Sequence, residues 1–224
     1  MPKIIETVVY SFEELDEKAQ KKAIQKNSEI NTDYNWWEDT YESFQTLSEF
    51  FAIELEMKKE GSKKVPAIYF QISCSQSDFV GFEGYLTNFE KLVKCCQNQS
   101  WKEDFTDLEI NGLPSFREYE FIDNYFEAIR EGSIEIGVTS SVNRSMRIET
   151  SSNVDSELNN NNLNATYDLL QIEKDVKTVF EVLNRQLKKW LENELEYLES
   201  DDAIKETLIA NDYTFTIDGE MFNK

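Results

Sequence analysis

The chain has 224 residues with 44 Asp and Glu against 23 Lys and Arg, a net charge of −21, and no His. Such a charge repels phosphate backbones and anionic membrane surfaces, while the missing His removes the usual general base and the commonest metal ligand. With 40% hydrophobic and 13% aromatic residues the chain is too apolar for a disordered acidic tail, so the composition favours a folded, partner-binding protein over an enzyme.

The N-terminal part predicts a strand followed by two helices. Apolar and polar residues alternate over 3–10, as in a strand. Ser11 and Glu14 have the spacing of a capping box and predict that a helix starts at Ser11. Thr32 or Asp33 is expected to cap a second helix that runs to about residue 51 and buries an aromatic face.

The middle of the chain predicts strands separated by short helices. Alternation and turn residues indicate that the strands are at 53–57, 67–73, 79–86, 133–139 and 144–150, with the last two joined by a turn at 141–143. Apolar spacings of three and four predict helices over 88–97 and 115–131.

The C-terminal part predicts a long helix over 165–198, after an Asn-rich segment at 151–164 that we expect to be a mobile loop. Ser200 is expected to cap a last helix, and 213–217 reads as a closing strand. The predicted fold class is therefore α+β: one domain over 1–224, with a mixed or antiparallel sheet packed by several helices including one long C-terminal helix.

The long helix carries a heptad-like apolar seam over 176–190. Because fewer than four clean heptads are present, we expect the seam to pack on the protein's own sheet. A homodimer through the seam is the alternative, although the like charges of two copies oppose it, and we expect a monomer.

The three cysteines, Cys74, Cys95 and Cys96, form neither a CxxC spacing nor an even set for disulfides, so we expect reduced thiols. The N-terminus has no signal-peptide pattern, and no apolar run approaches the ~20 residues that span a bilayer. These features predict a cytoplasmic protein.

A loop and the strand after it, residues 75–84, form the most motif-like stretch. Two readings are open: its polar groups and glycines converge on a ligand, or they hydrogen-bond their own turn. A carboxylate metal enzyme centred on Asp78 and Glu83, with Tyr85, is a further alternative; the leading interpretation includes no metal, cofactor or catalytic residue. The candidate loop residues are Ser75, Gln76, Asp78, Gly81, Phe82 and Gly84.

Acidic residues cluster in two places. Residues 101–135 carry ten acids against three basic residues, and 192–206 carry seven against one. Such patches attract a basic protein surface, and an exposed Trp would anchor the contact. The candidate partner-binding residues are Glu118, Glu120, Asp123, Glu127, Glu192, Glu194, Glu196, Glu199, Asp201, Asp202 and Trp36.

Three separated motifs resemble a family of small phage and prophage proteins. The start, residues 10–15 with 34–37, resembles the family's opening strand and helix; residues 75–84 resemble its SQGDGxxFxG motif; and 194–215 resemble its C-terminal end. Ser77 and Phe79 stand where the family has Gly, and this chain lacks the His residues that members often carry near 133–150. The resemblance implies a phage-encoded protein in a bacterial host cell, and some relatives carry an antitoxin label.

The leading hypothesis is a non-enzymatic anti-defence inhibitor that acts on an RNA-guided nuclease, as an anti-CRISPR protein does, or on another host defence nuclease. An acidic protein would be steered to the basic channel that holds the nucleic acid of such effectors. The alternatives are an antitoxin-like module that neutralises a basic toxin or RNase, the metal enzyme described above, and a structural or housekeeping phage protein.

Overall fold

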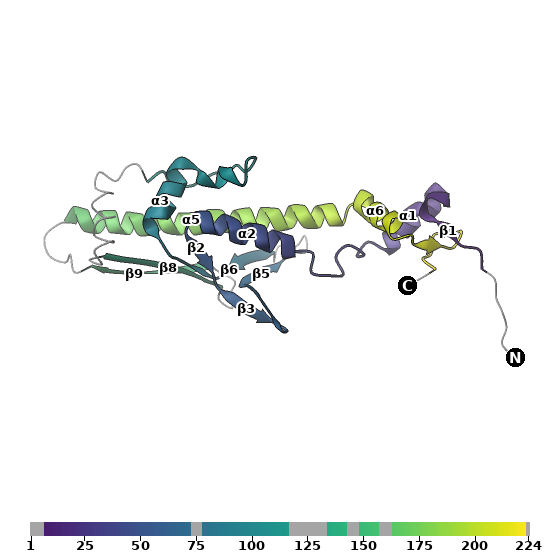
Figure 1. Ribbon diagram of the computed structural model, residues 1–224, viewed down its shortest axis with the longest axis horizontal. Helices are drawn as coiled ribbons and strands as arrows, with labels where there is room; N and C mark the ends of the chain where they lie inside the picture. The colour runs from purple at the N-terminus through teal and green to yellow at the C-terminus, as the bar shows by residue number, and fades with distance from the viewer. Residues whose placement is uncertain (1–6, 73–77, 117–133, 143–147, 157–162, 223–224) are drawn as a thin grey trace. The chain divides into compact units, whose positions relative to one another are not determined.

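The computed structural model describes residues 7–72, 78–116, 134–142, 148–156 and 163–222. The fold class is α+β, as predicted, and the strands in the described ranges pair antiparallel (Figure 1). Contacts divide the chain into two compact units, Met1–Glu38 with Leu191–Lys224, and Asp39–Trp190. The single domain over 1–224 stays a prediction.

The smaller unit is built from the two ends of the chain. Its elements are β1 (Tyr10–Ser11), η1 (Phe12–Glu14), α1 (Glu17–Lys26), α6 (Asp201–Ala210) and β10 (Thr214–Phe215). β1 pairs with β10, and Phe12 meets Phe215 edge to face at 6.1 Å between ring centroids. Ala19, Ala23 and Leu208 complete a buried core between α1 and α6.

The larger unit holds most of the strands. Its elements are α2 (Glu38–Phe50), β2 (Ile53–Leu55), β3 (Met57–Glu60), β4 (Lys63–Pro66), β5 (Ile68–Gln71), β6 (Phe79–Phe82), β7 (Gly84–Leu86), α3 (Phe89–Asn98), η2 (Ser100–Glu103), β8 (Ile134–Val142) and β9 (Ile148–Ser156). The sheet order is β2-β7-β8-β9, with separate β3–β4 and β5–β6 pairs. α5 (Leu163–Leu198) and α2 have residues in both units.

Three segments of this unit exchange partners at a backbone junction. Glu56 N–H donates to Glu83 C=O at 2.8 Å, Glu83 N–H to Ala67 C=O at 2.8 Å, and Ala67 N–H to Glu56 C=O at 2.7 Å. β2, β4 and β6 enter the junction, and β3, β5 and β7 leave it with different partners. The three hydrogen bonds satisfy the backbone where each segment changes partner, so the segments stay extended through the exchange.

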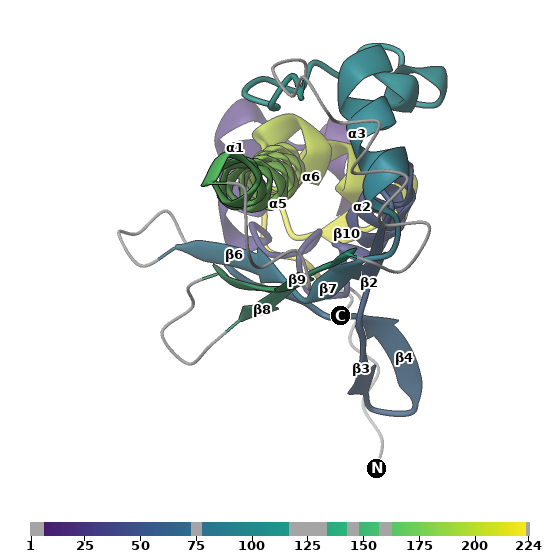
Figure 2. The same ribbon diagram turned by 90° about the vertical axis from the view of Figure 1, so that its left-hand side faces the viewer.

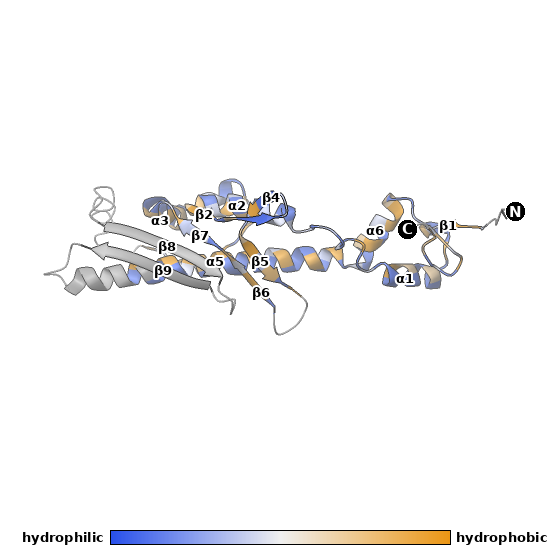
Figure 3. Cartoon of the chain, turned by 90° about the horizontal axis from the view of Figure 1, so that it is seen from below, coloured by the Kyte–Doolittle hydropathy of each residue, from blue (hydrophilic) through white to orange (hydrophobic). Residues whose placement is uncertain are grey.

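Phe82 on β6 is the centre of the core in this unit. Its ring is fully buried, meets Phe44 of α2 at 5.1 Å and stacks on Phe180 of α5 at 5.9 Å. Figure 2 shows α2 and α5 on the same side of the strands. β5 and β6 are mainly hydrophobic and β4 mainly hydrophilic (Figure 3), which agrees with burial of the β5–β6 pair and exposure of the β3–β4 hairpin.

The seam of α5 packs within the chain, as predicted. Val176, Phe180, Leu183 and Leu187 are buried, and Trp190 stacks on Phe105 at 5.8 Å. In the ranges that the structure describes, no helix is long and apolar enough to cross a membrane.

Several predicted boundaries were wrong. Of the strand predicted over 3–10, residues 3–6 lie outside the described residues and β1 covers Tyr10–Ser11. The capping box of Ser11 and Glu14 is present, as predicted, but it starts the short 3-10 helix η1. α1 begins after Asp16, whose side chain accepts the Ala19 N–H at 2.8 Å. The first part of the expected loop at 151–164 belongs to β9, because it pairs residue by residue with β8 and its backbone is satisfied by the ladder despite its polar composition. Likewise 141–142 belong to β8 rather than to a turn. Most of the helix predicted over 115–131 lies outside the described residues, as does 157–162.

Candidate functional site

Negative charge is unevenly divided between the two units. The unit made of Met1–Glu38 and Leu191–Lys224 has 18 acidic and seven basic residues, a net charge of −11. Asp39–Trp190 has 26 acidic and 16 basic residues, a net charge of −10. The smaller unit therefore carries about half of the net charge on a third of the chain.

The acids at the end of α5 and the start of α6 are mostly on the surface. The exposed ones are Glu192, Glu196, Glu199, Asp201 and Asp202, which together we name the acidic surface. Glu194, also predicted to contact a partner, is half-buried.

Helix electrostatics separates this surface into two parts. Asp201 and Asp202 lie in the first turn of α6, where Ser200 Oγ caps the Ala203 N–H at 3.2 Å and the helix dipole favours negative charge. Glu196 lies in the last turn of α5, where the dipole disfavours negative charge. Glu199 lies between the end of α5 and Ser200, the N-cap of α6, so the two helix termini act on its charge in opposite directions. The α6 acids thus have a structural role, whereas Glu196 opposes the stability of its own helix.

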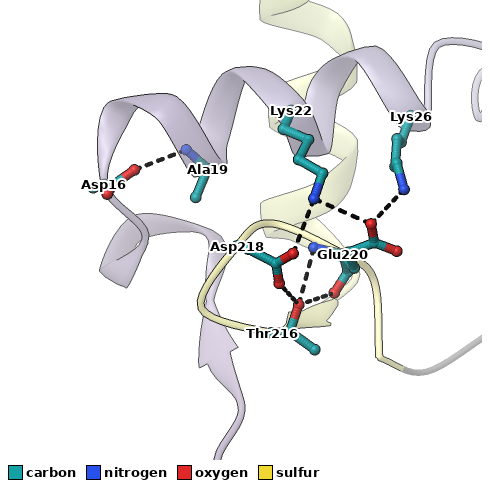
Figure 4. Close-up of polar contacts among 7 residues, drawn as sticks. All are labelled: Asp16, Ala19, Lys22, Lys26, Thr216, Asp218 and Glu220. Carbon is teal, nitrogen blue, oxygen red and sulfur yellow. Dashed lines mark hydrogen bonds and ion pairs between the residues drawn. The ribbon is translucent and has the colours of Figure 1, made fainter.

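Other acids in the same unit are held in ion pairs (Figure 4). Lys22 Nζ lies 3.0 Å from Asp218 Oδ2 and 3.1 Å from Glu220 Oε1, and Lys26 also contacts Glu220. The Thr216 hydroxyl donates to Asp218 Oδ1 at 2.6 Å, and with Lys22 it lowers the pKa of Asp218 to about 2. This cluster attaches the C-terminal turn to α1.

Within the described residues, no comparable ion pair involves Glu196, Glu199, Asp201 or Asp202. The charges that stabilise the unit are therefore concentrated at the C-terminal turn. The acidic surface is exposed to solvent, and Glu196 is the member of it whose charge opposes its own helix.

Trp36 is half-buried rather than exposed, and its ring meets Trp37 edge to face at 5.8 Å between centroids. The exposed aromatic residues in the described part of the same unit are Tyr34, Tyr197 and Phe222, at 60%, 57% and 48% exposure. None of them was predicted from the sequence as a contact residue, since a lone aromatic residue in a helix or loop gives no periodic signal.

The described part of the 75–84 motif, residues 78–84, is extended rather than a loop that gathers its side chains. Asp78 directly precedes β6, and Gly81 and Phe82 are buried within it. Gly84 begins β7, where an added Cβ would lie 2.7 Å from the Glu54 carbonyl oxygen, so this glycine permits the close approach of β2. Ser75 and Gln76 lie outside the described residues.

The structure separates Asp78 from Glu83. The two residues are at opposite ends of β6 and so about 17 Å apart along an extended strand, too far for both carboxylates to bind one ion. No cluster of three metal-ligating side chains occurs in the described ranges. The pairing of these carboxylates across a hairpin, on which the metal-enzyme alternative rested, was wrong because 79–82 is a single strand.

The strand junction gathers a polar cluster that the sequence did not indicate. The Tyr69 hydroxyl donates to Glu83 Oε2 at 3.3 Å, and Lys58 Nζ lies 4.2 Å from the centre of the Tyr69 ring and donates to the Ile68 carbonyl. Burial lowers the pKa of Lys58, which Glu60 and Glu83 partly offset. Burial raises the pKa of Tyr69, and Glu83 raises it further. These contacts join the segments that meet at the junction, so the cluster has a structural role there.

Cys95 and Cys96 are free and buried, and burial raises the pKa of both thiols, so they are unreactive core residues. Cys74 lies outside the described residues, and so do the predicted contact residues Glu118, Glu120, Asp123 and Glu127.

The chain belongs to a family described as a domain of unknown function, DUF8835, whose model matches residues 36–201. The match includes Trp36, the strand junction and the end of α5, and it stops at the start of α6. Neither the curated proteins nor the solved structures contain a match to the chain.

Proposed function

We propose that this protein is a non-enzymatic, phage- or prophage-encoded inhibitor that binds the basic nucleic-acid-binding surface of a bacterial defence nuclease. An RNA-guided nuclease is the first candidate, which would make the protein an anti-CRISPR protein that works in the cytoplasm. The observation that carries the proposal is the placement of the exposed Glu196 in the last turn of α5, where its charge does not serve the stability of the helix.

The acidic surface fits the chemistry of such a target. Nucleic-acid channels of these nucleases are lined with Lys and Arg that bind phosphate, and carboxylates on a folded surface offer the same charge. Long-range attraction would raise the rate of association and make it depend strongly on salt. Inhibition would follow because the protein and the nucleic acid occupy the same basic surface.

The test uses charge-reversal variants with equal net charge. Glu192, Glu196 and Glu199 changed to Lys remove the α5 part of the acidic surface. Glu42, Glu60 and Glu181 changed to Lys give the same charge change in the other unit, outside both acidic clusters; all six side chains are exposed. The wild-type protein should bind a purified nuclease–guide complex and inhibit DNA cleavage. The α5 triple variant should associate about ten times more slowly at low ionic strength, and the control triple much less so.

Association rates at ionic strengths of about 0.05 M and about 0.5 M separate the possible results, since screening removes the electrostatic contribution at the higher value. If both triple variants lose the same fraction of the association rate, the effect comes from net charge alone, and the proposal that the acidic surface binds the nuclease is wrong. If the protein binds none of the host's defence nucleases but binds a small basic toxin, the antitoxin alternative is correct and the acidic surface is the toxin-binding surface.

A further inference from the structure

We propose that one face of the β3–β4 hairpin binds an acidic peptide segment of a partner protein, with Asp or Glu carboxylates against two lysines and an apolar side chain against a methionine. The face consists of Met57, Lys59, Lys64 and Pro66, and we name it the basic face. The proposal concerns the Asp39–Trp190 unit and is independent of the acidic surface and of the function proposed above.

The hairpin has the opposite charge to the chain as a whole. Residues 57–66 contain four lysines and one glutamate, a net charge of +3 in a chain whose net charge is −21. The strands are joined by the two residues 61–62, and Gly61 has the positive φ of +60° that a tight hairpin turn requires. The turn thereby brings the four lysines together on two short strands.

The pairing register places two of these lysines directly opposite one another. Met57 pairs with Pro66 and Lys59 with Lys64, and because side chains alternate along a strand these four residues lie on one face. Like charges in opposite positions of paired strands are unfavourable. Lys59 and Lys64 are both exposed and form no ion pair within the described residues. The basic face is therefore unfavourable in the free protein and becomes favourable when carboxylates cover it.

The other face of the hairpin carries charges of both signs. Glu60 lies directly opposite Lys63, and Lys58 lies 4.2 Å from the centre of the Tyr69 ring. Glu56, which precedes β3, is on the same side of the extended segment as Lys58 and Glu60. The carboxylates of this segment therefore lie on the side away from the basic face, where they do not neutralise it.

Other basic stretches of the chain have acids beside them. In α1, Lys22 and Lys26 are in ion pairs with the C-terminal turn. In α5, Arg185 and Lys188 each have a glutamate four residues away, at the i,i+4 spacing of helical ion pairs. These lysines and this arginine have compensation in their own unit of structure, which the basic face does not have within the described residues.

The apolar part of the basic face favours a protein segment over nucleic acid. The Met57 side chain is 51% exposed, and a peptide can cover it with an apolar side chain, whereas a phosphate backbone offers only charge. The net charge of −21 also repels a nucleic acid, which carries a charge at every nucleotide, more strongly than a short acidic peptide. At physiological ionic strength charges beyond about 8 Å are screened, so the neighbouring lysines determine the local attraction.

The groove beside Met57 does not carry the proposal. Its charges are mixed, with Glu49 and Glu54 against Lys91. The proposed contact is therefore with the exposed hairpin face and not with the groove.

The experiment titrates the isotope-labelled protein with two acetylated and amidated hexapeptides at an ionic strength of about 0.1 M, where the Debye length is about 10 Å. The acidic peptide is Glu-Phe-Glu-Glu-Phe-Glu, and its neutral counterpart has Gln in place of each Glu. Amide signals of residues 57–60 and 63–65 should shift with the acidic peptide. The neutral peptide should bind about fivefold more weakly, or weaker still, because it lacks the two close ion pairs.

Lys59→Gln/Lys64→Gln removes both charges of the basic face. The matched control is Lys174→Gln/Lys177→Gln, which makes the same change in net charge at two exposed lysines of α5 in the same unit. The hairpin variant should bind the acidic peptide about fivefold or more weakly, and the control should lose less than about twofold. The Tm of the hairpin variant should equal or exceed that of the wild type, since a repulsion is removed, and this shows that lost binding does not come from unfolding.

Shifts outside residues 57–66, equal affinity for the two peptides, or undiminished binding by the hairpin variant would overturn the proposal. No shift with the acidic peptide would also overturn it, and would leave the lysines as protection against pairing with other strands. Tighter binding of a thymidine octanucleotide than of the acidic peptide at the same residues would assign the face to nucleic acid instead. Shifts of residues 57–60 that depend on protein concentration without peptide would assign it to a second copy of the chain.

Discussion

Reversing the two charges at the end of α5 should stabilise the protein while it weakens partner binding. The double variant Glu196→Lys/Glu199→Lys replaces negative charge in and just after the last helical turn, which contains no basic residue. An exposed charge near a helix terminus contributes about 0.3–1 kcal/mol, so reversing Glu196 removes one repulsion and adds one attraction. Reversing Glu199 has little net effect, because this residue lies between the negative end of α5 and the positive end of α6. The lysine introduced by Glu196→Lys would also follow Glu192 at the favourable i,i+4 spacing, a gain of about 0.2–0.5 kcal/mol.

The expected gain in the free energy of unfolding is therefore about 1–2.5 kcal/mol, or about 2–10 °C in Tm for a chain of this length. Thermal unfolding followed by far-UV circular dichroism measures it, at low and at high salt. The gain should shrink in high salt because exposed charges are screened.

The control for this measurement is Asp104→Lys/Asp107→Lys, which makes the same change in net charge at two exposed residues outside the α-helices. A general relief of self-repulsion would raise the Tm of both double variants equally. An unchanged or lower Tm for the α5 variant, or a rise no larger than that of the control, would refute the argument that Glu196 opposes its helix.

Three further predictions test the supporting structure. Gly219→Ala should destabilise the protein by about 2–4 kcal/mol in chemical denaturation, because its φ is +80° and the new Cβ would lie 2.2 Å from a backbone oxygen. Gly61→Ala is the control: its φ is +60° but no atom lies within 4 Å of the new Cβ, so the loss should be only about 1 kcal/mol. The pKa of Asp218 is lowered to about 2, so its ion pair stabilises the fold above pH ~4 and this contribution is lost as pH falls toward 2. Asp218→Asn should remove that part of the pH dependence of stability, and the control Asp212→Asn should leave it in place. Phe82→Ala should cost about 3–5 kcal/mol, and a loss below 1 kcal/mol would contradict its central position in the core.

Local signals in the sequence predicted α3, α5 and α6 well, whereas the cap expected at Thr32 or Asp33 was wrong because α2 begins at Glu38. Asn88 caps α3 and Ser200 caps α6 because their side chains accept backbone N–H groups of the first turn, an interaction between residues only three apart. The apolar spacing of α5 predicted its buried residues, such as Phe180, because one face of a helix is determined by the chain itself.

Strand pairing was not available from the same signals. Alternation indicates which side chains of 53–60 face the core, but β2 and β3 choose different partners on either side of Glu56, and this choice depends on two other segments. The polar segment 151–156 gave no strand signal, since its pairing with β8 is decided by backbone hydrogen bonds rather than by side-chain pattern. The sequence showed that the acids of the candidate site cluster at 192–206. It could not show that Glu196 lies in the last turn of α5, because that depends on where the helix ends, which is at Leu198.

Acids that stabilise the fold can be distinguished from acids that do not by the charges and helix termini around each of them. Asp218 is held by Lys22 and Thr216, and Asp201 lies at the positive end of α6, so both charges lower the free energy of the folded chain. Glu196 raises it, and a chain with a net charge of −21 does not need this charge for solubility. A charge that is unfavourable in the isolated protein becomes favourable when a basic surface covers it, because the partner supplies the opposite charge that the helix end lacks. Binding should therefore be strongest where the free protein is least well compensated, at the last turn of α5.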